Sequence, residues 1–124
     1  MRRSKILVCL MLALVLVVGM ASSAMAASFY FKFDPDVIRN ANYTDYERCD
    51  GTKTAYVDPG TSVSTAYQLK DTNKYVSNAI SSTGSRKSFT YKPDYGREGD
   101  RYLMMGAPNV SDYAEYHVSG TWKP

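Results

Sequence analysis

Two side chains of this sequence, Cys49 and His117, could together form a nucleophile and a base. His117 is the only histidine of the chain, and a thiol beside an imidazole is a common form of activated nucleophile. However, His117 falls on the polar face of a predicted strand, and no G-x-S-x-G motif offers a serine nucleophile instead. We therefore predict no catalytic residue, and we interpret His117 as a solvent-facing sheet residue and Cys49 as a free thiol. A disulfide between two chains through Cys49 stays open as the alternative.

Acidic residues are concentrated in the polar segment that follows the first predicted strand. Carboxylates on a loop could bind calcium, but their spacing fits no EF-hand and basic residues lie between them. A carboxylate pair could also hydrolyse a glycosidic bond, yet among 12 acidic residues some pair at a suitable distance is expected by chance. We interpret the segment as a solvated loop and predict a protein that is not an enzyme and has no metal or cofactor. The acidic residues concerned are Asp34, Asp36, Asp45, Glu47 and Asp50.

Tyrosine is abundant, with 11 residues, and all of them follow the N-terminal leader described below. Aromatic residues suit half-buried strands, and on a surface they could bind sugars or proteins. Tyr95 and Tyr102 flank a glycine-containing loop and are our candidates for a surface binding site. A platform formed by Tyr113, Tyr116 and Trp122 is the alternative, but alternation along the last predicted strand places Tyr116 and Trp122 on its core face.

The first 26 residues have the three parts of a secretory signal peptide. A cationic segment, Arg2 to Lys5, precedes the apolar run Ile6 to Met20, and Ala24 and Ala26 form an A-x-A cleavage site. We predict cleavage after Ala26, so that Ala27 begins the mature chain. The apolar run is about 15 residues long, short of the ~20 that span a bilayer, so an uncleaved anchor is the less favoured alternative.

The predicted mature chain, residues 27–124, is one small domain without net charge. Three of the 15 basic residues lie in the leader and all 12 acidic residues follow it, so the basic pI belongs to the precursor. A neutral domain lacks the basic surface typical of nucleic-acid binding, and we predict no nucleic-acid partner. Cys49 is the only cysteine after the leader, which excludes an intramolecular disulfide. We predict a monomer that is secreted or held at the cell wall, has no stable membrane span after cleavage, and acts on an unknown protein or a component of the cell envelope.

Alternation of apolar and polar residues predicts about seven short strands in the mature chain. The clearest is Phe29–Phe33, which ends at Asp34-Pro35, and the longest alternation is Ala114–Trp122. Turn signals roughly every 8–12 residues, without a long helical pattern, are typical of antiparallel sandwiches. We predict an all-β fold, a small antiparallel β-sandwich preceded by a cleaved signal helix. The other predicted strands are Thr52–Val57, Val63–Leu69, Tyr75–Ile80, Lys87–Tyr91 and Arg101–Met105.

Two segments are ambiguous. Asp36–Gly51 has no sustained periodicity, so we interpret it as a long polar connection in which Val37, Ile38 and Ala41 could support one helical turn. Tyr75–Ile80 could be a short helix or a strand. We favour a strand because the segment is short and a turn rich in serine and glycine follows it directly.

Four motifs between Tyr67 and Pro124 carry a resemblance: DTNKYVSN, SFTY, YGREGDRYLMM and the terminal VSGTWKP. With them, the second half of the chain resembles a family of small secreted proteins of Gram-positive bacteria that carry a domain of unknown function. The resemblance implies a β-sandwich and secretion. Some related small secreted sandwiches are similar to lactococcin-type bacteriocins, which implies antimicrobial action by analogy, although a shared fold does not imply a shared function.

We expect a secreted, non-enzymatic β-sandwich that acts outside the cell through its surface, as a bacteriocin-like protein or another extracellular factor. A carbohydrate- or cell-wall-binding module is the alternative, and the tyrosine content favours it. A small secreted hydrolase is the second alternative. It would need Cys49 beside His117, or two facing carboxylates in a cleft.

Overall fold

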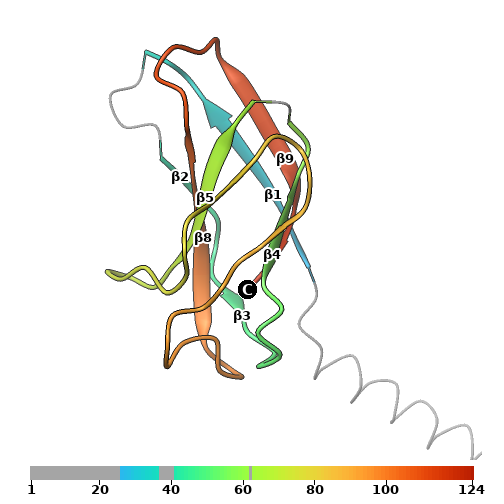
Figure 1. Cartoon of the computed structure of the whole chain (residues 1–124), viewed down its shortest axis with the longest axis vertical. Coiled ribbons are helices and arrows are strands. Elements are labelled where there is room, and N and C mark those ends of the chain that lie inside the picture. The colour runs from blue at the N-terminus through green and yellow to red at the C-terminus, as the bar shows by residue number, and fades with distance from the viewer. Residues whose placement is uncertain (1–25, 37–40, 62) are drawn as a thin grey trace, which may run out of the picture.

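The computed structural model describes residues 26–36, 41–61 and 63–124, and in these ranges it contains nine strands and no helix. The strands form two antiparallel sheets, which confirms the predicted all-β sandwich fold (Figure 1). Six strands correspond to predicted ones, β6 shares only its first residue, Ile80, with a predicted strand, and β2 and β3 are additional. Residues 1–25 of the leader, Ala24 among them, lie outside the described residues, as do Val37 and Ile38 of the possible helical turn. The strands are β1 (Ala27–Phe33), β2 (Asn42–Tyr43), β3 (Glu47–Arg48), β4 (Tyr56–Pro59), β5 (Thr65–Lys70), β6 (Ile80–Ser82), β7 (Lys87–Ser88), β8 (Arg101–Pro108) and β9 (Tyr116–Lys123).

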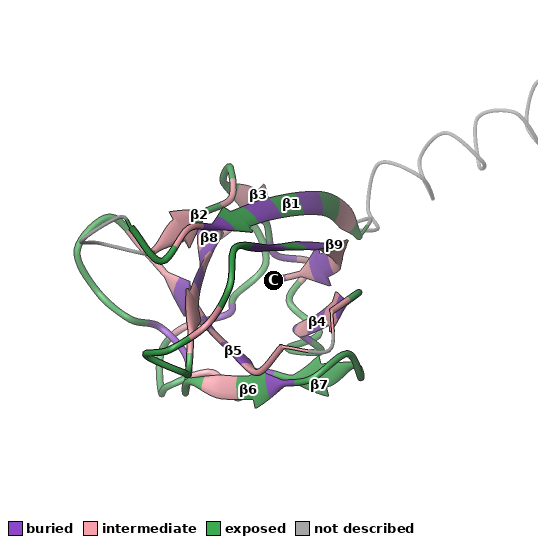
Figure 2. Cartoon of the chain, turned by 90° about the horizontal axis from the view of Figure 1, so that it is seen from above, coloured by how far each residue is buried: buried purple, intermediate pink, exposed green. Residues whose placement is uncertain are grey.

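Each sheet is built around one long inner strand. The first sheet has the order β1–β9–β4–β7, and the second has the order β2–β8–β5–β6, with β3 also paired to β8. Seen from above, buried segments alternate with more exposed ones along strands of both sheets (Figure 2), and the buried side chains of the two sheets form one hydrophobic cluster. On one side of the sandwich β6 contacts β7, and on the other side β1 contacts β2. β1 and β2 belong to different sheets and are not joined by a ladder of hydrogen bonds. The seam between them is therefore bordered by two strand edges.

Alternation determines which face of each strand enters the core. In β1, Phe29, Phe31 and Phe33 are buried, whereas Tyr30 and Lys32 are exposed, as predicted. Each buried ring of this size stabilises the fold by about 2–3 kcal/mol relative to an exposed one. The prediction that Tyr116 and Trp122 belong to the core is also confirmed. The other strands add Val57, Thr65, Tyr67, Leu69, Tyr102, Met104, Tyr116, Val118 and Trp122.

The prediction of a strand over Tyr75–Ile80 is wrong. Only isolated bridges form there, at Tyr75 and Ser77, and β6 begins at the last residue of the segment. Val76 and Ser77 are both buried, because the Val76 N–H donates to the Leu69 carbonyl and the Ser77 hydroxyl accepts the Leu69 N–H. Two consecutive buried residues break the alternation that a half-buried strand requires.

The polar segment before β4 also differs from the prediction. The described part of this segment, residues 36 and 41–51, is mostly irregular, as expected, but β2 and β3 pair within it to the central strand β8. The next strand begins at Tyr56 instead of Thr52. Asp50 causes this later start of the strand. Its carboxylate accepts the Thr52 N–H at 2.9 Å and the Thr52 hydroxyl at 2.6 Å, and these bonds hold a turn.

An ion pair joins this turn to the C-terminal end of the chain. The Lys123 ammonium lies 2.7 Å from the Asp50 carboxylate and donates to the Thr54 hydroxyl at 2.9 Å. Both charged side chains are largely buried, at 16% and 12% exposed. Burial alone would raise the pKa of Asp50, but the hydrogen bonds from Lys123 and Thr52 outweigh it and lower that pKa from 3.8 to about 2.

Asp50→Asn is expected to lower the free energy of unfolding by about 2 kcal/mol at neutral pH, the equivalent of this pKa shift. Because the pKa is lower in the folded state, the carboxylate contributes this stability above about pH 4 and loses it as the pH falls toward 2. Urea unfolding from about pH 2.5 to pH 7 measures both effects. The wild-type protein should lose more stability in acid than the variant, and Asp112→Asn, at an exposed carboxyl, should behave as wild type. Equal pH dependence in wild type and Asp50→Asn would contradict the assignment.

Candidate functional site

Cys49 and His117 contact different tyrosines and do not form a nucleophile–base pair. The Cys49 sulfur is buried, 3.4 Å from the Tyr91 hydroxyl, and burial raises the pKa of the thiol. His117 is exposed on β9, where its ring stacks on Tyr30 with 5.5 Å between ring centres and Nδ1 shares a hydrogen bond with the Tyr30 hydroxyl. Reactive cysteines are accessible thiolates, so Cys49 in this setting is a core residue.

The structure brings Tyr95 and Tyr102 together but does not place both on the surface. Their ring centres are 6.4 Å apart in an edge-on contact. Tyr95 is half-buried against the core, and Tyr102 is only 3% exposed, so the prediction of a surface site is wrong for Tyr102. The Tyr102 hydroxyl accepts the Gly96 N–H and donates to Asp100. Burial, and to a smaller extent the hydrogen bond to Asp100, raises the pKa of Tyr102 to about 12.

A pocket of about 280 Å³ lined by these two tyrosines contains one ion pair and one carboxylate that is hydrogen-bonded within the loop. The Arg97 guanidinium lies 3.3 Å from Asp94, and the Arg97 N–H donates to Asp100 at 3.1 Å. These contacts join the ends of the loop and hold it as a turn. We assign the glycine-containing loop a structural role.

Two glycines of this loop have left-handed backbone but different surroundings. Gly96 has φ +82°, and a Cβ there would lie 2.5 Å from the Tyr91 ring. Gly99 has φ +87°, but a Cβ there would meet only the flexible end of Arg48, at 3.9 Å. The spacing Y-G-x-x-G-x-x-Y thus reflects two left-handed turn positions that favour glycine, of which only the first also has a close ring contact.

The acidic residues of the polar segment point to different places. Asp50 is held in the ion pair described above, Asp34 accepts the N–H of Asp36, and Asp45 and Glu47 line a cleft. Among the described residues, no three histidine, cysteine or acidic side chains lie close enough to hold a metal ion. Within the same part of the chain, no helix is long and apolar enough to cross a membrane.

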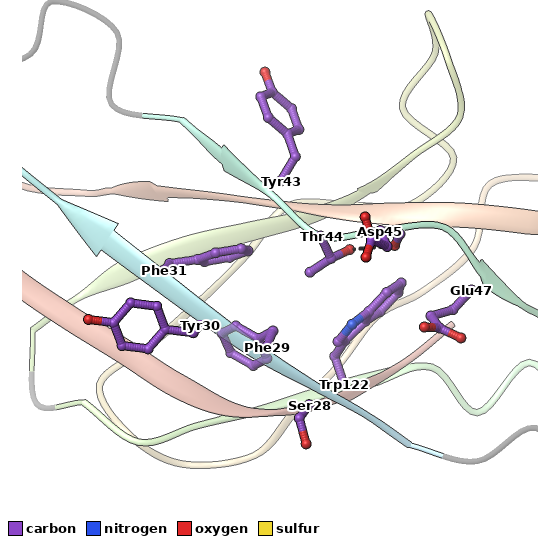
Figure 3. A pocket seen from close by; sticks show the side chains of 9 residues that line it. All are labelled: Ser28, Phe29, Tyr30, Phe31, Tyr43, Thr44, Asp45, Glu47 and Trp122. Carbon is purple, nitrogen blue, oxygen red and sulfur yellow. Dashed lines mark hydrogen bonds between the residues drawn. The ribbon is translucent and has the colours of Figure 1, made fainter.

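The second opening of interest lies along the seam between β1 and β2–β3, and we call it the edge cleft (Figure 3). Its volume is about 230 Å³. One wall is β1, and the other is the segment from Tyr43 to Glu47. The Asn42 side-chain amide closes the seam at one end by donating to the Lys32 carbonyl at 2.9 Å. The lining residues are Ser28, Phe29, Tyr30, Phe31, Tyr43, Thr44, Asp45, Glu47 and Trp122.

The wall opposite β1 is fixed to the second sheet by Thr44. The Thr44 N–H donates to the Met104 carbonyl at 3.0 Å, and the Met104 N–H donates back to the Thr44 hydroxyl at 2.8 Å. The floor is equally constrained, because Phe29, Phe31 and Trp122 are almost completely buried. A cleft with such walls and floor is preorganised, so ligand binding does not include the entropy cost of ordering it.

The rim of the edge cleft is aromatic, and its outer wall is acidic. Tyr30 is 62% exposed and Tyr43 is 52% exposed, and both rings point outward from the cleft (Figure 3). Asp45 and Glu47 lie on the same wall, with Trp122 between Glu47 and Phe29. Neither carboxylate forms an ion pair with a described residue, in contrast to Asp50. The cleft therefore presents apolar rings next to two negative charges without a cationic partner.

None of these lining residues is a favoured site residue in the sequence analysis, and only Trp122 belongs to the aromatic platform given there as an alternative. The sequence marks Asp45 and Glu47 only as members of an acidic segment. Their spacing of two residues is the one signal that both side chains point to the same side of an extended segment. The position of β1 beside this segment depends on how the two sheets pack. Sequence alternation does not reveal that packing.

Gly96→Ala is expected to destabilise the fold more than Gly99→Ala. The alanine at 99 should cost about 1–2 kcal/mol for the left-handed backbone alone, and the alanine at 96 should cost about 1–3 kcal/mol more because it displaces the Tyr91 ring. Chemical unfolding of the two variants against wild type measures the difference. Equal losses in both would contradict the close contact of Gly96 with Tyr91.

Comparison of the chain with family models, with characterised proteins and with solved structures finds no match. The resemblance of the second half to small secreted proteins of Gram-positive bacteria therefore stays a prediction. The edge cleft, with its aromatic rim and two unpaired carboxylates, is the best candidate for a functional site in the described residues.

Proposed function

We propose that the mature chain, residues 27–124, is a secreted, non-enzymatic β-sandwich that acts outside the cell by binding a protein or a cell-envelope component in the edge cleft. The observation that carries this proposal is the edge cleft itself. It combines exposed tyrosine rings, a fixed apolar floor and two carboxylates without a cationic partner. Such a combination suits recognition, because aromatic anchors provide affinity and unpaired charges provide specificity.

Export is supported by where the first strand begins. The leader has the charge, apolar run and A-x-A site of a signal peptide, and β1 starts at Ala27, the residue that follows the expected cleavage site. A chain cleaved after Ala26 would thus keep the whole of β1. Cleavage several residues later would remove Phe29 from the core and is disfavoured for that reason.

The positions of the two potentially reactive side chains support a role without catalysis. Cys49 is buried against Tyr91, and His117 stacks on Tyr30 at the surface. The nucleophile–base pair that a cysteine hydrolase would need is therefore not formed by these residues. Bacteriocin-like action on other bacteria is compatible with a binding protein of this kind, and growth inhibition of related strains by the purified protein tests it.

A carbohydrate- or cell-wall-binding module is the second candidate. The features that favour it are the outward-facing rings of Tyr30 and Tyr43 at the rim, beside the Asp45 and Glu47 carboxylates and the Thr44 hydroxyl. Rings on which a sugar can stack, next to oxygen acceptors for its hydroxyl groups, suit glycan recognition.

Tyr43→Ser is expected to reduce retention of the protein on purified Gram-positive cell envelopes about fivefold or more, because an exposed rim ring is lost. Tyr75→Ser is the matched control. Tyr75 is also an exposed tyrosine, its ring centre is likewise 5.6 Å from the Lys70 ammonium, and it does not line the edge cleft. A co-sedimentation assay with quantified bound protein measures both variants.

Four results would test these candidates. Release of bound protein by soluble glycan would favour the carbohydrate-binding module, and release by protease treatment of the envelopes would favour a protein partner. Equal retention of the two tyrosine variants would remove the edge cleft from the proposal. Recovery of no protein on envelopes would exclude an envelope partner.

A further inference from the structure

The peptide groups of β1 that face away from β9 can be identified from the hydrogen bonds of its neighbours. In an antiparallel ladder, the N–H and C=O of a residue point together, either toward the partner strand or away from it, and the direction alternates. The Gly60 N–H donates to the Ser119 carbonyl at 2.7 Å, so Ser119 turns its peptide groups away from β1. Tyr30 lies opposite Ser119 in the β1–β9 register. Tyr30 must therefore turn its own N–H and C=O away from β9.

A second hydrogen bond gives the same orientation independently. The Lys32 carbonyl accepts the side-chain amide of Asn42, which lies on the far side of β1 from β9. Lys32, Tyr30 and Ser28 are spaced by two residues, so all three share this orientation. Asn42 thus occupies the carbonyl of Lys32. The outward-facing peptide groups of Ser28 and Tyr30, in contrast, have no hydrogen-bond partner among the described residues.

These unpaired groups border the edge cleft, since Ser28 and Tyr30 are both lining residues. An outer strand with free N–H and C=O groups is a template for another strand. A segment added there would alternate its side chains. One set would point to the cleft floor at Trp122 and Phe29, and the other would run along Tyr30 on the outer face (Figure 3).

The negative charge of the cleft favours a basic segment. Asp45 and Glu47 form the wall opposite β1 and have no ion-pair partner among the described residues. A lysine or arginine of an added strand would supply the missing positive charge. A glycan could stack on the rim tyrosines, but it lacks the alternating donors and acceptors that the edge of β1 requires.

We propose that the edge cleft binds an extended, basic polypeptide segment, which adds as a strand to the free edge of β1 at Ser28 and Tyr30 and places a basic side chain against Asp45 and Glu47. This ligand class rests on the proposed binding function and makes it specific. Main-chain hydrogen bonds would provide the affinity, and the carboxylates would provide the preference for positive charge.

The test uses Trp122, the only tryptophan of the chain, as a probe inside the cleft. The purified protein is titrated with the capped peptide acetyl-VKVKVK-amide while tryptophan emission is recorded. We expect a saturable change in emission at peptide concentrations below about 1 mM. The acidic peptide acetyl-VEVEVE-amide should produce none. The double variant Asp45→Asn, Glu47→Gln should bind the basic peptide at least about tenfold more weakly, because it removes two charge-assisted contacts.

A backbone control separates strand addition from simple charge attraction. The basic peptide is prepared with N-methyl groups on alternate residues, in both registers, so that one form cannot donate to β1. Strand addition predicts that one register loses binding and the other keeps it. Equal binding of both registers, or no response of Trp122 up to about 1 mM peptide, would overturn the proposal. Envelope retention that depends on Tyr43 would then still hold, so the two proposals fail separately.

The occupant could instead be a second copy of the chain. Sedimentation velocity of the peptide-free protein tests this. A monomer that binds the basic peptide supports the proposal, whereas a dimer that the Asp45→Asn, Glu47→Gln variant leaves intact and that blocks the peptide would overturn it.

Discussion

The pairing of β1 with β9 is the interaction on which the rest of the structure depends. It joins the first strand of the described chain to the last one, with Ala27 opposite Trp122 and Phe33 opposite Tyr116. The register places the three phenylalanines of β1 on the same side as the core residues of β9, so both strands deliver large rings to one interior. Gly106 of the opposite sheet completes this contact, since a Cβ there would lie 2.6 Å from the Phe31 ring. A one-residue slip would turn every one of these rings to solvent.

The same pairing leaves the other edge of β1 without a strand partner. Natural sheets usually protect such an edge, and here Asn42 covers only the Lys32 end. The remaining edge is held open between rigid elements, because Thr44 fixes the opposite wall to β8 and the C-terminal ion pair of Lys123 with Asp50 secures the end of β9. Stability and exposure are therefore separated in this fold. The core and the ion pair stabilise the sandwich, and the free edge is available for recognition.

The sequence predicted the strands whose burial strictly alternates and missed the elements determined by partners distant in the chain. The phenylalanines of β1 and the core face of β9 follow from local patterns. β2 and β3 have only two residues each and exist because β8 pairs with them, so no local pattern could reveal them. Tyr102 looked like a surface residue beside a glycine loop, but its hydroxyl is satisfied internally by Gly96 and Asp100, which allows the ring to be buried. The edge cleft escaped prediction for the same reason, since its two walls belong to different sheets.

Residue-specific amide hydrogen exchange along β1 measures whether one edge of this strand is free. A free edge predicts alternation: the N–H groups of Phe29 and Phe31, bonded to β9, should exchange orders of magnitude more slowly than those of Ser28 and Tyr30. Uniform protection from residue 28 to residue 31 would contradict it, because another strand or segment would then have to cover the edge.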